Sequence, residues 1–158
     1  LSALLARERK PVSFGSFTYY EVMNATMVTG AGTRNVIPDA FQLNVNYRFA
    51  PGRSIESAQA EFEDFIAGQC EIEWTDVSPS GPVCLDNAYL KPLLADETIV
   101  HEPKQAWTDV AHLGLHDIDA VNLGPGESAQ AHQRNESCAI ELITAGYELF
   151  ERYLTLQR

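Results

Sequence analysis

His132 is the residue of this chain whose setting best suits chemistry. It follows the turn Gly124-Pro125-Gly126 and precedes a long amphipathic segment. In α/β enzymes, functional groups gather where a strand ends in such a turn, and a neutral imidazole is a common metal ligand. From this setting, His132 is either a metal ligand or an ordinary surface histidine. The rest of the chain contains no obvious set of companion ligands.

The remaining histidines are weaker candidates. His112 and His116 are spaced i, i+4, which can bring two imidazoles to one metal ion, but no glutamate lies between them as an H-E-x-x-H zinc site requires. We therefore expect an exposed or capping role for this pair. His101 shares its segment with Glu102 and Lys104, and we expect it to be solvated in a loop.

Arg48 is a candidate for binding an anion. Residues 40–49 alternate between apolar and polar types, which predicts a half-buried strand with Arg48 on its polar face beside Asn44 and Asn46. A guanidinium can hold a carboxylate through two parallel hydrogen bonds. The alternative is that Arg48 has no binding role and simply lies on a solvent-exposed face of the strand.

The charge balance limits the partners. The chain has 158 residues, with 11 Lys and Arg against 22 Asp and Glu, a net charge of −11 and a pI near 4.6. Nucleic acids and anionic membranes are therefore repelled at long range. No run approaches the roughly 18 apolar residues of a membrane span. We expect small molecules, peptides or proteins as partners, with no nucleic acid and no membrane.

The cysteines and the first residues bear on location. Cys70, Cys84 and Cys138 are an odd number without C-x-x-C spacing, which predicts reduced, buried thiols in a cytoplasmic protein. Residues 1–6 are too short for a signal peptide. Because the chain starts without methionine and with Leu1 and Leu4 on one helical face, we expect it to be a piece of a longer protein.

The N-terminal half predicts a sheet with one strand missing. Strands over residues 17–28 and 40–49 are joined by a glycine-bearing connection and predict an antiparallel hairpin. A helix capped by Ser54 and ended by Gly68 follows, and then a strand over residues 71–77. A ferredoxin-like βαββαβ sandwich needs one further central strand. We expect an upstream segment or another chain to fill that position, because its neighbours would otherwise carry unpaired backbone groups.

The C-terminal half predicts helices that cover a sheet located elsewhere. Short helices are expected over residues 86–95 and 108–115, short strands over 98–101 and 120–123, and a final helix with an apolar stripe over 139–154. Two short strands are too few for three helices. The fold class is therefore α/β, preceded by an α+β domain.

Five segments together resemble the second half of the dizinc peptidase family, which includes succinyl-diaminopimelate desuccinylase, acetylornithine deacetylase and glutamate carboxypeptidase. The desuccinylase branch resembles the chain most. The matching segments are Thr33–Asp39, Asn44–Phe49, Trp107–Asp109, Asn122–Gly126 and His132–Glu136. The resemblance implies that residues 1–81 are an incomplete ferredoxin-like lid and dimerisation domain without its first strand. Residues 82–158 are then the C-terminal part of the zinc-peptidase catalytic α/β domain, and a homodimer forms through the lid.

The resemblance also implies roles for individual residues. His132 matches the last zinc ligand of the family. Asn35 matches a lid asparagine that reaches the active site of the partner in these dimers, and Arg48 matches a lid arginine that grips a substrate carboxylate. Thr108 and Asp109 match a polar turn near the substrate pocket, although Gln105-Ala106-Trp107 replaces the usual glycines ahead of it.

The family's glycine turn and its other catalytic groups complete the comparison. Gly124 and Gly126 match the tight turn that lets the backbone approach the ligand. The family uses two bridged zinc ions and a glutamate as general base. The H-x-D motif and the Glu-Glu pair that would supply most of these groups do not occur in the chain. One imidazole cannot form a catalytic zinc site, which takes about three protein ligands, so we expect the chain alone to be inactive.

Three interpretations follow. In the first, the chain is the C-terminal portion of a cytoplasmic, homodimeric, zinc-dependent amidohydrolase that cleaves an N-acyl amino acid in amino-acid biosynthesis. Desuccinylation in lysine biosynthesis is preferred within it, with acetylornithine deacetylase or carboxypeptidase chemistry as alternatives. In the second, the chain is a non-catalytic dimerisation or binding module. In the third, it is an unrelated α+β protein in which the motifs are coincidental.

Overall fold

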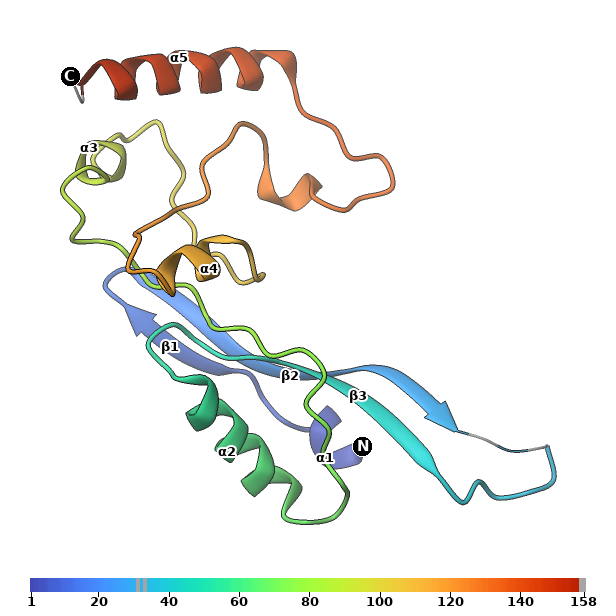
Figure 1. Cartoon of the computed structure of the whole chain (residues 1–158). Coiled ribbons are helices and arrows are strands. Elements are labelled where there is room, and N and C mark those ends of the chain that lie inside the picture. Colours follow the sequence, from blue (N-terminus) through green and yellow to red (C-terminus); the bar gives the residue numbers. More distant parts are fainter. Residues whose placement is uncertain (31, 33, 157–158) are drawn as a thin grey trace. The chain divides into compact units, whose positions relative to one another are not determined.

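The computed structural model describes residues 1–30, 32 and 34–156 (Figure 1). The chain divides into two compact units. The first unit contains Leu1–Val83 and Glu102–Ile118, and the second contains Cys84–His101 and the segment from Asp119 onward. The segment 102–118, which the sequence assigns to the second domain, is thus part of the first compact unit. The division at residue 81 stays a prediction about domains, and each unit is described by itself.

The first unit is built on a three-stranded antiparallel sheet in the order β1-β2-β3. The predicted hairpin is confirmed, because Gly30 pairs with Phe41 and Val22 with Arg48. Its elements are α1 (Ser2–Leu5), β1 (Lys10–Phe14), β2 (Phe17–Gly30), β3 (Phe41–Arg48), α2 (Ile55–Ile66) and α4 (Val110–Gly114). The helix that the sequence places over residues 108–115 corresponds to α4.

Strand β1 is missing from the sequence-based prediction. It forms a second hairpin with β2 through the two-residue turn Gly15-Ser16, in which Gly15 has φ 57°. Glycine adopts this left-handed conformation without the steric cost that a Cβ brings. The Gly-Ser pair between Phe14 and Phe17 is a recognised hairpin signal, and it could have revealed the strand.

The apolar core lies between the sheet and α2. Leu4, Met23 and Phe62 are buried there, surrounded by half-buried side chains from both hairpin strands, α2 and Ile72. The predicted cap of α2 is confirmed: Ser54 Oγ accepts a hydrogen bond of 3.1 Å from the Ser57 N–H. Such a cap satisfies one of the otherwise unpaired N–H groups of the first turn.

A cluster of charges around the buried Glu21 closes one side of this core. Glu21 is only 4% exposed, and Arg53 Nη1 lies 3.0 Å from its Oε2 and 2.6 Å from Glu61 Oε2. Lys10 Nζ lies 3.4 Å from Glu21 Oε2, and Arg53 also donates to the Tyr47 hydroxyl at 2.9 Å. Burial, with the carboxylates of Glu21 and Glu61, raises the pKa of Tyr47 to about 12. The cluster ties β1, β2, β3 and α2 together.

The third predicted strand, over residues 71–77, is wrong. That segment has no strand pairing, although Ile72 packs on the core and the ring of Trp74 meets that of Phe62 edge-on at 5.6 Å. A strand exists only beside a partner. In the described part of the chain, β3 pairs on one side only, with β2. Only Ile72 of this segment is half-buried, Trp74 is exposed, and the described residues contain no neighbouring strand that pairs with it.

The second unit consists of helices and irregular chain. It contains α3 (Lys91–Leu94), the short 3₁₀ helix η1 (Ser128–Gln130) and α5 (Ile140–Leu156). The strands predicted over residues 98–101 and 120–123 are wrong: the described residues of this unit contain no strand, and Val100 is 81% exposed. Short apolar runs need neighbouring strands to become a sheet. The helix predicted over 86–95 is shorter, and the final helix is confirmed.

Side-chain contacts join segments of the second unit, whose described residues contain no sheet. Asn87 Nδ2 donates to Asp119 Oδ2 at 2.9 Å, and the Tyr153 hydroxyl of α5 donates to the carbonyl of Tyr89 at 2.8 Å. The apolar stripe of α5 stays largely exposed, with Ile143 at 51% and Leu154 at 61%. None of the helices in the described residues is both long and apolar enough to cross a membrane.

The cysteines are free, as predicted. Their predicted burial is wrong for two of them, because Cys70 and Cys138 are exposed and Cys84 is half-buried. Burial and a hydrogen bond with Asp119 raise the pKa of the Cys84 thiol, so this thiol is poorly reactive at neutral pH.

Candidate functional site

His132 lies in an exposed turn of the second unit. Its φ of 65° is in the left-handed region, which residues other than glycine rarely adopt. The conformation is supported by Glu136, whose Oε2 accepts a hydrogen bond of 3.0 Å from the His132 N–H. Glu136 thus fixes the backbone that carries the imidazole. No group of three or more metal-ligating side chains occurs among residues 1–30, 32 and 34–156.

The turn at residues 124–126 is held against α5. A Cβ added to Gly146 of α5 would lie 3.2 Å from Pro125 Cβ, so the helix and the turn pack closely. Gly126 has φ 98°, and a Cβ there would lie 3.3 Å from Cys138 Sγ. Gly124 has open space around it. Glycine is therefore required by this fold at position 126, whereas at position 124 this chain alone does not require it.

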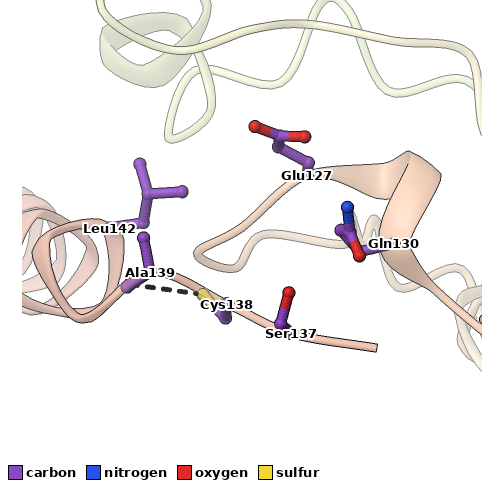
Figure 2. A pocket seen from close by; sticks show the side chains of 6 residues that line it. All are labelled: Glu127, Gln130, Ser137, Cys138, Ala139 and Leu142. Atoms are coloured by element: carbon purple, nitrogen blue, oxygen red, sulfur yellow. Dashed lines mark hydrogen bonds between the residues drawn. The ribbon is translucent and has the colours of Figure 1, made fainter. Parts of the chain in front are cut away.

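A small hollow lies beside this loop (Figure 2). Its volume is about 160 Å³, below the roughly 300–1,000 Å³ typical of ligand pockets. Glu127 and Gln130 line one side and Leu142 lines the other (Figure 2). His132 is not among the lining residues. The hollow is too small to hold an acyl amino acid by itself.

Arg48 occupies the position that the alternation of residues 40–49 predicts. Gln42, Asn44, Asn46 and Arg48 are exposed, while the intervening side chains are half-buried. Arg48 Nε donates to Asn46 Oδ1 at 3.2 Å. Among the described residues, no carboxylate forms an ion pair with Arg48. Its charge is therefore available to an external anion.

Asn35 lies at the other end of the hairpin, in the exposed loop between β2 and β3. Because β3 extends from Phe41 to Arg48, and a strand rises about 3.4 Å per residue, Asn35 and Arg48 are separated by roughly 24 Å or more. The structure of one chain thus does not bring these two predicted residues together. Thr33, the first residue of this sequence motif, lies outside the described residues.

The segment with Thr108 and Asp109 is fixed to strand β2 by Gln105. The Tyr20 N–H donates to Gln105 Oε1 at 3.1 Å, and Gln105 Nε2 donates to the Thr18 carbonyl at 3.3 Å. The pairing of β2 with β3 ends at Val22 and Arg48. The Tyr20 N–H and the Thr18 carbonyl lie on β2 beyond this point, where β3 no longer pairs with it. The side-chain amide therefore continues the sheet and places this segment near the Arg48 end of β3.

Thr108 and Asp109 are not among the residues that line the hollow of Figure 2. Thr108 is half-buried and Asp109 is exposed, and Asp109 precedes α4 without a side-chain cap hydrogen bond. The neighbouring Trp107 ring meets the His112 ring edge-on at 5.2 Å. The role of Gln105 was not recognised from the sequence, where the residue counted only as a departure from the usual glycines.

Comparisons with known proteins agree with the predicted resemblance. Residues 2–72 match the family described as a peptidase dimerisation domain. The chain is similar to a protein of Mycobacterium tuberculosis that is provisionally named a succinyl-diaminopimelate desuccinylase, with 36% identity over 155 residues. It is also similar to the succinyl-diaminopimelate desuccinylase of Corynebacterium glutamicum, with 30% identity over 162 residues. Both alignments cover 98% of this chain, which spans 44% and 43% of the two relatives.

Proposed function

We infer the function from the family to which the chain belongs, the peptidase family of the succinyl-diaminopimelate desuccinylases. The chain is the C-terminal portion of a zinc-dependent amidohydrolase that cleaves an N-acyl amino acid. The observation that carries this proposal is similarity over 98% of the chain to desuccinylases more than twice its length. A desuccinylase of lysine biosynthesis in the cytoplasm is the preferred assignment, with acetylornithine deacetylase or carboxypeptidase activity as alternatives. The free cysteines are compatible with that location.

We propose that the zinc site of the complete enzyme needs residues from outside this chain. The described residues contain no group of three ligands, whereas a catalytic zinc ion takes about three protein ligands. We propose that His132 contributes one ligand to a two-zinc site that other residues of the complete enzyme finish. The hydrogen bond from the His132 N–H to Glu136 supports this role, because it fixes the backbone of the ligand. The isolated chain is then inactive.

Arg48 is proposed to bind a carboxylate of the substrate. It is exposed, lacks an ion-pair partner among the described residues and is oriented by Asn46. A guanidinium oriented before binding loses less conformational freedom when the carboxylate arrives. Thr108 and Asp109 are proposed to line the same substrate site, because Gln105 holds their segment near this end of β3. Gly124 and Gly126 are proposed to let the backbone approach the ligand.

Asn35 is proposed to act in the active site of a second copy. Its separation from Arg48 by the length of β3 supports two different sites within a dimer. Strand β2 supplies an edge for that dimer: β1 pairs only with residues 17–21, so the same side of β2 has no partner strand beyond them in the described residues. Met27, on that part of β2, is 64% exposed. Exposed edges and apolar side chains favour association.

A non-catalytic dimerisation module is the second candidate function. The match of residues 2–72 to a dimerisation domain family favours it, because this match carries no information about catalysis. The two candidates differ in what the complete protein does, since only an amidohydrolase needs metal and releases an amine from an N-acyl amino acid.

The test uses the complete protein and the isolated chain side by side. For the complete protein we expect about two zinc ions per protomer and release of succinate from N-succinyl-diaminopimelate. For the isolated chain we expect neither stoichiometric zinc nor hydrolysis. A complete protein that dimerises but binds no zinc and cleaves no acyl amino acid would leave the dimerisation module as the function.

A further inference from the structure

Arg9 directly precedes β1, and extending the register of the sheet places it near Arg48 on the outer face, the face opposite α2. The β1–β2 register pairs Lys10 with Glu21, so continuing it by one residue sets Arg9 opposite Val22. Val22 pairs with Arg48 on its other side. Adjacent strands are about 4.8 Å apart, which puts the Cα atoms of Arg9 and Arg48 about 10 Å apart.

Both side chains project from this outer face. Lys10 reaches the buried Glu21 on the core side, and successive residues of an extended chain point to opposite faces. Arg9 accordingly lies over the ring of Tyr20, with its guanidinium carbon 4.7 Å from the ring centroid. Tyr20 and Val22 share a face because they are two residues apart on β2. The two guanidinium groups therefore flank one strip of β2.

Neither guanidinium is neutralised within the described chain. Three other arginines form ion pairs with carboxylates: Arg7 and Arg53 pair with Glu61, and Arg152 pairs with Asp96. Arg9 and Arg48 contact a tyrosine ring and an asparagine amide instead. In a chain with 22 acidic and 11 basic residues, two adjacent cations without carboxylate partners form a local site for anions.

We propose that Arg9 and Arg48 bind two carboxylates of the same substrate, with Arg9 as a specificity-determining residue for a carboxylate on the acyl chain. This inference rests on the proposed amidohydrolase function. Each guanidinium can hold one carboxylate in a bidentate pair, and the Tyr20 ring holds Arg9 in place before the ligand arrives. The favoured substrates are N-acyl amino acids whose acyl group ends in a carboxylate, such as succinyl derivatives, over N-acetyl derivatives.

The experiment compares the N-succinyl and N-acetyl derivatives of one amino acid on the complete enzyme. Affinity is measured as KM for a derivative that is cleaved and as Ki for one that is not. Arg9→Gln is expected to weaken the affinity for the succinyl derivative about tenfold, the loss of one charge-assisted contact, and to leave that for the acetyl derivative within about twofold. Arg9→Lys is expected to fall between wild type and Arg9→Gln for the succinyl derivative.

The control is Lys91→Gln, which removes an exposed positive charge from α3 and is expected to change neither affinity. The thermal unfolding midpoints of all variants are compared, to check that a loss of affinity does not come from a loss of stability. Because Arg9 is exposed, its replacement should leave the midpoint unchanged. Equal affinity losses for both derivatives, or no loss for either, would overturn the assignment of Arg9 to the acyl carboxylate. If the wild-type enzyme binds neither derivative, the proposed function itself fails and this inference fails with it.

Discussion

At the scale of single residues, Arg48 gives the most direct test of substrate binding. Arg48→Ala in the complete enzyme is expected to raise KM for a carboxylate-bearing substrate about tenfold or more, because a charge-assisted hydrogen bond contributes roughly 1.5–3 kcal/mol. The free energy of unfolding should change little, since Arg48 is exposed and bonds only to Asn46 among the described residues. Gln42→Ala, on the same polar face, is the control. An unchanged KM would remove Arg48 from the substrate site.

Glu61 makes the first unit sensitive to acid. Although burial opposes it, the hydrogen bond with Arg53 lowers the pKa of Glu61 in the folded chain. A carboxyl group with a lowered folded pKa contributes stability above its unfolded value of 4.5, and this contribution is lost as the pH falls through the folded value. For the wild type, the urea concentration at the unfolding midpoint should therefore decrease as the pH is lowered below 4.5. For Glu61→Gln, this decrease should be smaller. Glu63→Gln, on the same helix, is the control, and its unfolding midpoint should decrease with falling pH as much as that of the wild type.

At the scale of elements, the two glycines of the 124–126 turn separate folding from ligand approach. Gly126→Ala is expected to destabilise the second unit by about 1–2 kcal/mol, because its left-handed φ suits alanine poorly. Gly124→Ala should leave the stability unchanged, since a Cβ there meets open space. If Gly124 lets the backbone approach the substrate, this variant lowers kcat/KM in the complete enzyme. Equal stability losses for the two variants, measured by urea unfolding, would contradict this distinction.

The sequence predicted elements well where the local pattern decides the structure. Strict alternation located β3, and Ser54 with Gly68 marked the ends of α2, because caps and side-chain periodicity act within a few residues. The segments 71–77, 98–101 and 120–123 did not become strands, because strand formation needs a neighbour that alternation does not reveal. The alternation predicted that Arg48 lies on the exposed face of β3, whereas the roles of Arg48 and His132 stay predictions. The bond of Gln105 to β2 was not predicted, since that contact joins residues 85 apart.

At the scale of the whole molecule, the exposed side of β2 tests the proposed dimer. Met27→Lys puts a charge on that edge, and natural proteins use lysine to prevent edge pairing. The variant is expected to shift the complete enzyme from dimer to monomer in sedimentation equilibrium, and to lower activity because Asn35 then reaches no partner site. Ala60→Lys, on the exposed surface of α2, adds the same charge and should stay dimeric. A dimeric Met27→Lys would place the interface elsewhere.

The discontinuous make-up of the first unit affects how the chain folds during synthesis. Thr18 and Tyr20 emerge from the ribosome early, yet Gln105, which bonds to them, follows about 85 residues later, after the rest of β2, β3, α2 and a segment of the second unit. At roughly 5–20 residues per second, that part of β2 waits on the order of 4–20 s for its partner. During this interval the nascent strand offers free backbone groups to other chains. Slow translation or crowded polysomes should therefore increase misassembly of this protein, and a chaperone that shields the strand should reduce it.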